Sequence, residues 1–312
     1  MASPSSAPRS GPRLEIPIFG ADTGVLAASL GARRIELNRA GSYAVGGTTP
    51  TLAELTSLIT ALSSSSLSQS KRCCVRVMIR PRGKQQQQQQ DFIYSDAEFA
   101  SMRNTVLRVA EQGLLDPDRG DGFVFGVLKV KSGGSGGTGG AVEVDVDRSR
   151  ELVRLAAPFR CVFHRAFDDL FAPAAGVRGG DGDGSDEVGD ALRRVKGAGF
   201  NGVLTSGGPG NAVDNKERLG KILRVARELG VEVIVGGGVR SENVRGLAEG
   251  MELGSSDAAG EGGDDGDEGE AAPAVWFHSS CFAAKGDDGV VGFDPNEVRG
   301  MVKEVAAVEK GV

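Results

Sequence analysis

The 312-residue sequence has few aromatic residues, only two histidines and only four cysteines. Aromatic side chains make up 5% of the chain, which argues against a stacking surface for single-stranded nucleic acid. We find no run of about 18 apolar residues, so the sequence predicts no membrane-spanning helix. The cysteines lack the spacing of a disulfide framework and we find no secretory signal, which together favour a reducing compartment.

Acidic residues outnumber basic ones, and the net charge is −6. Seven of the acids lie at residues 254–273, a stretch without lysine or arginine, so the rest of the chain is close to neutral. A chain without a strong field of one sign is not drawn to nucleic acid or to an anionic membrane surface. We therefore expect neither as a partner.

Glycine is abundant instead, with 48 residues, and much of it falls in segments of low complexity. Such segments cannot bury enough apolar surface to offset the entropy lost on ordering. We expect a disordered tail at residues 1–12 and disordered insertions near residues 62–70, 84–90, 131–140, 177–190 and 254–273. The remainder of residues 13–312 then forms one domain.

Between these insertions, short runs rich in β-branched residues alternate with amphipathic segments. The expected strands are residues 14–19, 33–38, 74–82, 122–130, 159–167, 201–207, 231–239 and 274–280. The clearest helices are residues 21–31, 51–59, 96–113 and 219–230, with Asp96 as an N-cap and Gly113 and Gly230 as closing glycines. Strands that alternate with helices form a parallel sheet, either doubly wound or closed. Eight units in about 250 residues, without a GxGxxG turn after the first strand, favour a single-domain (β/α)8 TIM barrel.

Polar residues occupy inward-facing positions near the ends of several expected strands. Side chains alternate along a strand, so Glu15, Glu36, Arg80 and His164 should face away from the helix layer. Reactive groups of such barrels lie at the carboxyl ends of the strands, and we expect these four to meet at that mouth as candidate catalytic residues. Because a buried charge needs a partner, they form either an ion-pair network or a polar site for a small anionic ligand.

Two glycine-rich turns, residues 205–211 and 236–244, follow the sixth and seventh expected strands. In barrels, the loops after the last strands often hold phosphate through backbone N–H groups. We expect Ser241 to cap the helix after the second turn. The candidate ligand-binding residues lie in these turns or on the inward-facing side of neighbouring strand ends: Arg82, Asp168, Thr205, Ser206, Gly237, Gly238 and Ser279.

Patterns for metal binding are sparse. Cys161 faces the expected helix–sheet core, and Cys73 and Cys74 begin a strand at the end opposite the mouth. His278 and Cys281 have an H-x-x-C spacing and offer an imidazole and a thiolate, which suit copper(I) or zinc. This spacing supplies two candidate metal ligands at the mouth.

Several longer motifs resemble the copper homeostasis protein CutC family, over residues 14 to 309. They are RRIEL at 33–37, GGTTPT at 46–51, MIRPRG at 78–83, FHRAFD at 163–168 and FHSS at 277–280. The resemblance implies a (β/α)8 barrel, a cytoplasmic location, a role in copper tolerance and trafficking, and Cu(I) as the bound ion; an additional nuclear location is left open. It also implies copper-binding cysteines at two strand positions, which in this chain are Pro17 and Asn38. The family is not tied to a settled reaction.

Two functions therefore stay open, and the sequence does not decide whether the chain is an enzyme. The first is copper homeostasis through intracellular copper binding and trafficking. The alternative is a barrel enzyme of the lyase, isomerase or hydrolase type that acts on a small anionic or phosphorylated metabolite. In that case His164 or Glu36 is the general acid or base and Arg80 holds the anion. The partner is a metal ion or a small anion, and a homo-oligomer is left open.

Overall fold

Eight parallel strands form a closed barrel in the computed structural model, which describes residues 13–65, 73–84, 91–131, 141–172, 185–253, 273–283 and 292–310. The strands around the barrel are β1 (Arg13–Phe19), β2 (Arg34–Asn38), β3 (Cys74–Met78), β4 (Gly122–Phe125), β7 (Arg160–Phe163), β8 (Gly202–Thr205), β9 (Glu232–Val235) and β10 (Val275–His278). The barrel closes where β10 pairs with β1. The predicted (β/α)8 fold is confirmed.

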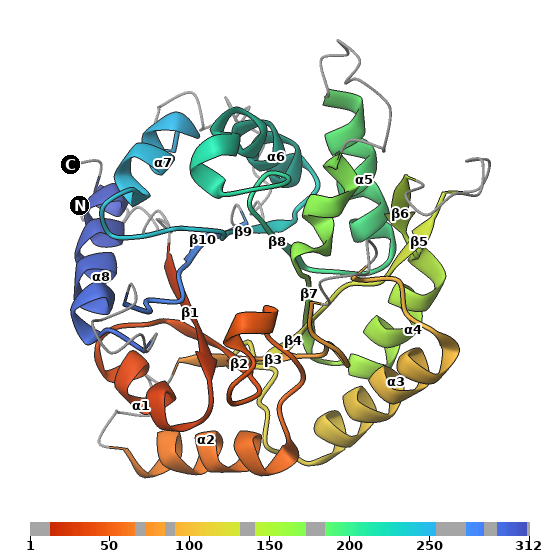
Figure 1. The fold of residues 1–312 in the computed structure, drawn as a ribbon, viewed down its shortest axis with the longest axis horizontal. Helices are drawn as coiled ribbons and strands as arrows, with labels where there is room; N and C mark the ends of the chain where they lie inside the picture. The colour runs from red at the N-terminus through yellow and green to blue at the C-terminus, as the bar shows by residue number, and fades with distance from the viewer. Residues whose placement is uncertain are drawn as a thin grey trace, which may run out of the picture.

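Helices surround the barrel on its outer side (Figure 1). They are α1 (Asp22–Ser29), α2 (Leu52–Ser64), α3 (Asp96–Glu111), α4 (Val146–Ala156), α5 (Ser185–Gly197), α6 (Lys216–Glu228), α7 (Val244–Gly250) and α8 (Pro295–Lys310). Short 3-10 helices follow strands at η1 (Tyr43–Val45), η3 (Arg165–Phe171) and η4 (Ala212–Asn215). Within the described ranges, no helix is long and apolar enough to cross a bilayer.

The run expected as one strand at 122–130 is two strands. β4 ends at Phe125, and β5 (Leu128–Val130) leaves the barrel to pair antiparallel with β6 (Val142–Val144). Gly126 lies between them, and a Cβ at this position would lie 2.7 Å from Nδ1 of His164. The strand pattern is therefore interrupted where the backbone approaches a neighbouring side chain.

Strand residues divide into two layers by alternation, as predicted. Ile16, Ile35 and Val77 pack with the helices in the outer core. The opposite side of the strands fills the barrel interior with a smaller cluster: Met78, Val124, Val162, Leu204, Ile234 and Trp276. Polar residues of this inward parity then lie above and below the apolar plug.

Several helix ends follow the sequence pattern, and one differs. Gly113 and Gly230 follow α3 and α6 with φ of 66° and 64°. The N-cap of α3, however, is Ser95 and not Asp96, because the Ser95 hydroxyl accepts from the Glu98 N–H while Glu98 bonds back to Ser95. Asp96 is the first residue of the helix itself.

Two of the expected insertions overlap helices at their edges. Residues 62–64 are the last turn of α2, where Leu62 is buried, and residues 185–190 begin α5, where Val188 is buried. The many serines and glycines in these two segments concealed the one buried apolar residue in each, Leu62 and Val188, from the sequence analysis. Residues 66–70, 85–90, 132–140, 177–184 and 254–272, as well as the tail 1–12, lie outside the described residues.

Candidate functional site

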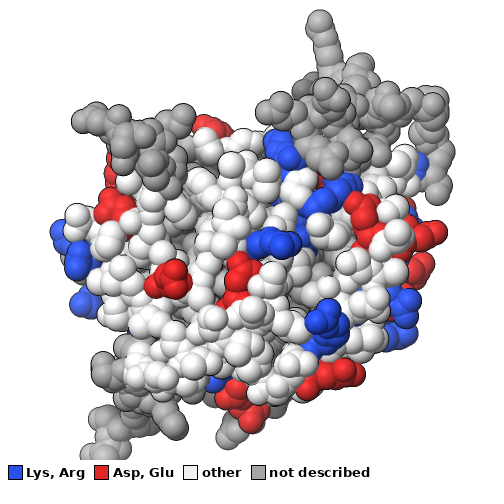
Figure 2. Space-filling view, turned by 60° about the horizontal axis from the view of Figure 1, so that its bottom comes forward, with Lys and Arg blue, Asp and Glu red and all other residues white. Residues whose placement is uncertain are grey.

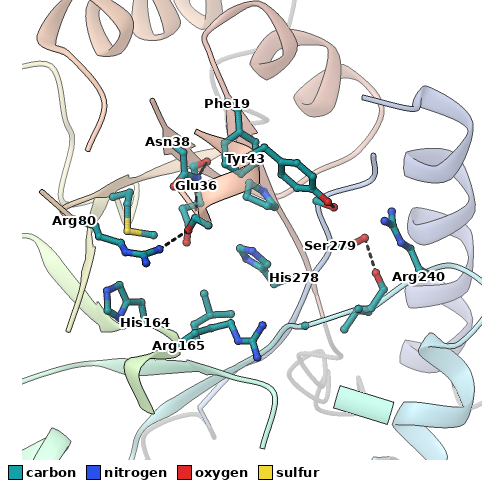
Figure 3. Close-up of a pocket in the computed structure, with 18 of the residues that line it drawn as sticks. Phe19, Glu36, Asn38, Tyr43, Arg80, His164, Arg165, Arg240, His278 and Ser279 are labelled. Carbon is teal, nitrogen blue, oxygen red and sulfur yellow. Dashed lines mark hydrogen bonds between the residues drawn. The ribbon is translucent and has the colours of Figure 1, made fainter. Parts of the chain in front are cut away.

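A cavity of about 290 Å³ opens at the carboxyl ends of the barrel strands (Figure 3). We call it the mouth cavity. Its lining combines acidic, basic and aromatic side chains with a glycine-rich loop: Pro17, Phe19, Glu36, Asn38, Tyr43, Gly46, Met78, Arg80, Phe92, His164, Arg165, Leu204, Gly237, Gly238, Val239, Arg240, His278, Ser279 and Ser280. Figure 2 shows Lys and Arg side chains mixed with Asp and Glu side chains on the visible face, without a large area of one sign among the described residues. The local field in the cavity therefore comes mainly from its own lining.

An ion network in the barrel interior supports the acidic side of the cavity. Glu15 of β1 pairs with Arg34 of β2, which also donates to Glu232 at 2.7 Å. Arg34 lies 3.8 Å from the ring centroid of Trp276. Burial raises the pKa of Glu15, but the Arg34 charge and the hydrogen bond with His278 outweigh burial and leave the pKa at about 2. Glu15 is therefore ionised and held in place.

Glu15 also orients His278, the last residue of β10. Oε1 of Glu15 lies 2.6 Å from Nδ1 of His278. Burial lowers the pKa of His278, but this hydrogen bond and the charges of Glu36 and Glu15 raise it above its usual value. A carboxylate on one ring nitrogen fixes the ring orientation and directs the other nitrogen elsewhere.

Glu36 is the second carboxylate of the site. Its Oε1 accepts a hydrogen bond from Asn38 at 3.0 Å, and its Oε2 is buried without a hydrogen-bond partner among the described residues. Burial raises the pKa of Glu36 above its usual value, with Glu15 adding to the effect. Ligand atoms of Glu15, Glu36 and His278 all lie within 4.8 Å of one another. This spacing lets the three side chains share one cation.

The structure brings most of the predicted mouth residues together. Glu36, Arg80, His164, His278, Gly237, Gly238 and Ser279 all line the cavity. Glu15 lies beneath and bonds His278. The alternation rule works for Glu36 and His278 within strands, and for His164 and Arg80, which lie one and two residues beyond strand ends. Five further predicted residues do not line the cavity: Arg82, Asp168, Thr205, Ser206 and Cys281.

The Asp168 carboxylate occupies the interior of the glycine-rich turn after β8. Its carboxylate accepts from the Thr205 hydroxyl at 2.5 Å, from the Ser206 N–H at 3.0 Å and from the Gly208 N–H at 3.2 Å. The Arg165 guanidinium donates to it at 2.7 Å. The donors that we expected to hold a ligand phosphate thus bind a side chain of this protein, so the expected role of Thr205 and Ser206 is wrong in this conformation.

Arg82 and Cys281 lie outside the cavity because each has other partners beyond the end of its strand. β3 ends at Met78, and Arg82 then donates to Glu98 at 2.6 Å. Cys281 adopts φ of 49° and is buried in the outer hydrophobic core. Burial raises the pKa of its thiol to about 11. The H-x-x-C spacing therefore does not create a metal-binding pair.

Ser241 has a partner other than the one predicted. Its hydroxyl donates to Glu297 of α8 at 2.7 Å, and α7 begins after Asn243 without a side-chain cap. Ser241 therefore links the turn after β9 to α8. The sequence could not show this because the partner is 56 residues away.

Several lining residues escaped the sequence analysis. Tyr43 stacks on Phe282 at 4.4 Å between ring centroids and forms part of the rim. Phe92 and Arg240 come from loops and Arg165 begins the 3-10 helix η3, where no strand period assigns a direction to a side chain. Pro17 and Asn38 carried a usable signal, because they share the inward parity of Glu15 on β1 and Glu36 on β2.

Comparison with known proteins identifies related sequences and a similar solved structure. A family model described as CutC family matches residues 13–258. A family protein CutC from Vibrio vulnificus is 33% identical over 220 residues, which are 70% of this chain and 68% of that protein. The copper homeostasis protein cutC homolog of Homo sapiens is 29% identical over 237 residues, or 76% of this chain and 69% of that protein.

The structure of the putative copper homeostasis protein CutC from Streptococcus agalactiae has a TM-score of 0.58 with this chain. It is 21% identical, and the match covers 85% of this chain and 97% of that chain. At this identity the likeness establishes the fold alone.

Proposed function

The chain belongs to the CutC family, and from this membership and the geometry of the mouth cavity we propose that it serves copper homeostasis by binding and trafficking a copper ion. Two kinds of support converge. Relatives from animals carry the name copper homeostasis protein. The cavity also gathers donors that suit a transition metal.

The convergence of Glu15, Glu36 and His278 carries this proposal. Two carboxylates and an imidazole are ligands for Cu²⁺ and other divalent ions, whereas Cu⁺ prefers thiolates and thioethers. Among the described residues the cavity lining contains no cysteine, and Met78 is its one sulfur-bearing side chain. We therefore propose a divalent copper ion. Its binding would displace the proton between Glu15 and His278 and would give Oε2 of Glu36 a partner.

Copper titration of single variants tests the proposal. Glu36→Gln keeps the volume of the side chain and removes a charged ligand, so we expect at least about tenfold weaker Cu²⁺ binding by calorimetry. Cys281→Ser should bind as the wild type does, and so should Glu249→Gln, which changes an exposed carboxylate on α7. Two results would refute this site. One is Cu²⁺ binding by Glu36→Gln that equals that of the wild type, and the other is loss of Cu⁺ or Cu²⁺ binding in Cys281→Ser.

A second candidate function is an enzyme that acts on a small anionic metabolite. The observation in its favour is the basic character of the cavity lining, which includes Arg80, Arg165 and Arg240. Turnover is measured by proton NMR after incubation with separate sets of hydroxy acids and sugar phosphates. New product signals that vanish with His164→Asn would support this function, and their absence with both sets would count against it.

A further inference from the structure

Arg80 is a buried cation with a long salt bridge to Asp91. It follows β3, is 5% exposed, and donates through NH1 to the carbonyl oxygens of Gly46 at 2.9 Å and Gly47 at 3.3 Å. Asp91 lies 3.8 Å from NH2. Nε is buried without a hydrogen-bond partner among the described residues. The long ion pair compensates this buried charge only in part, and Nε donates to no described residue, so the guanidinium is suited to an incoming anion.

His164 adds a neutral donor to the same wall. Its Nδ1 accepts the Ala166 N–H at 3.2 Å, so the proton of the neutral ring is on Nε2. Nε2 is buried and has no partner in the described part of the chain. Burial and the Arg80 charge lower the pKa of His164 to about 3, so the ring stays uncharged and donates a single proton.

A third residue joins the two donors into one wall. The Phe92 ring lies 4.7 Å from the His164 ring centroid, and Cζ of Arg80 lies 5.0 Å from the Phe92 centroid. Gly126 makes room for His164, because a Cβ there would clash with the imidazole. Figure 3 shows Arg80 and His164 on one side of the cavity, with His278, Ser279 and Arg240 on the other.

We propose that Arg80 and His164 form an oxyanion subsite, which binds the carboxylate or phosphate group of a small ligand in the mouth cavity. This rests on the second candidate function above, in which the ligand is anionic. The guanidinium can donate a charged hydrogen bond to one oxygen of the anion, and the neutral imidazole N–H can donate an uncharged hydrogen bond to another. Glu36 and His278 also line the cavity and can contact the remainder of the ligand, which favours a small acid or phosphate ester with hydroxyl groups.

The cavity volume limits the size of this ligand. About 290 Å³ is close to the lower end of the usual range for small-molecule sites, about 300 Å³. A compound of a few carbon atoms fits this volume, so the subsite suits compact anions.

Calorimetric titration of the full chain with inorganic phosphate and, separately, with glycolate tests the subsite and tells the two kinds of oxyanion apart. We expect the wild type to bind one of them, and Arg80→Gln and His164→Leu each to weaken that binding at least about tenfold. His164→Asn keeps an N–H donor and should retain more affinity than His164→Leu. Arg82→Gln is the matched control, because Arg82 is a nearby arginine outside the cavity, and it should bind as the wild type does.

Circular dichroism and thermal melting confirm that each variant is folded before titration. Wild-type protein that binds neither anion, or an Arg80→Gln variant that binds as the wild type does, overturns the subsite. Copper titration of the same variants separates the two proposals. Variants that lose anion binding but still bind copper would support the subsite and show that it is distinct from the copper ligands. Anion binding without any product in the NMR assay supports the subsite and contradicts the enzyme.

Discussion

Glu15 and Glu36 are buried carboxylates on adjacent strands, yet their surroundings move their pKa values in opposite directions. Arg34 and His278 overcome the effect of burial at Glu15, whereas burial dominates at Glu36. Glu15 is therefore ionised, with Arg34 and His278 as its partners. Glu36 has an oxygen without a hydrogen bond to any described residue, which is available to a ligand.

The same balance of burial and charge predicts how stability depends on pH at His164. The folded-state pKa is lowered to about 3, whereas an unfolded histidine titrates near about 6.5. Below about pH 6.5 the unfolded state therefore binds the extra proton, and the free energy of unfolding falls as the pH falls. We expect this single group to contribute a slope of up to about 1.4 kcal/mol per pH unit between about pH 6 and pH 4.

Urea unfolding of the wild type and His164→Asn over this range measures the contribution. The variant lacks the titrating ring, so its stability should fall less steeply with acid than that of the wild type. Parallel pH profiles for the two proteins would show that His164 is not held neutral by the fold.

Alternation along strands made individual mouth residues predictable from the sequence. It placed Glu36 and His278 correctly, because both lie within extended backbone of β2 and β10. It failed at Arg82, four residues beyond the end of β3, although it held at His164 and Arg80, one and two residues beyond strand ends. Parity is thus informative within a strand and for one or two residues beyond it.

At the scale of elements, the turn after β8 and the 3-10 helix η3 are joined through Asp168. This carboxylate is buried and accepts from backbone and side-chain donors of the turn. We expect Asp168→Asn to lower the free energy of unfolding by about 3 kcal/mol, because it breaks a buried charged network. Urea unfolding measures this change.

An exposed aspartate provides the control for that variant. Asp190→Asn removes an exposed pair with Arg193 and should cost less than about 0.5 kcal/mol. An Asp168→Ala variant should also gain more thermal stability from sulfate than the wild type does, because the emptied turn accepts an outside anion. Equal stability of Asp168→Asn and wild type would contradict this role.

Elements with strong periodic patterns were predictable, and elements with long-range partners were not. The capping box of α2, with Thr51 and Glu54, is visible as a local motif. The β5–β6 pair was missed because its partners are separated by an intervening segment without a periodic pattern. The filling of the β8 turn by Asp168 was missed because it joins groups 37 or more residues apart.

At the scale of the whole molecule, Arg34 holds together several sides of the barrel interior. It joins Glu15 of β1 and Glu232 of β9 and stacks on Trp276 of β10. Arg34→Met would leave two acids without their counter-charge, and we expect a loss of about 3–5 kcal/mol in the free energy of unfolding. Trp276 is the single tryptophan, so its fluorescence follows the transition directly.

The adjacent arginine is the matched control. Arg33→Met alters an exposed side chain one position earlier and should change stability by less than about 0.5 kcal/mol. A wild-type-like transition for Arg34→Met would mean that the interior network contributes little to the barrel.

The closed barrel itself was predictable from the repeated strand–helix pattern. Eight repeats in one domain leave few arrangements, and the parallel crossover rule removes most of the others. What the sequence could not supply was the direction of loop residues such as Phe92 and Arg240, because loops follow tertiary contacts rather than a period.

The pairing of β1 with β10 brings the beginning and the end of the described chain to neighbouring positions on the barrel, where α8 also packs against β1. Circular permutation exploits this kind of adjacency. If the two ends were joined by a short linker, the gene could instead start at Ala141 and stop at Lys131, between β5 and β6. All eight barrel pairings would be retained in the permuted protein.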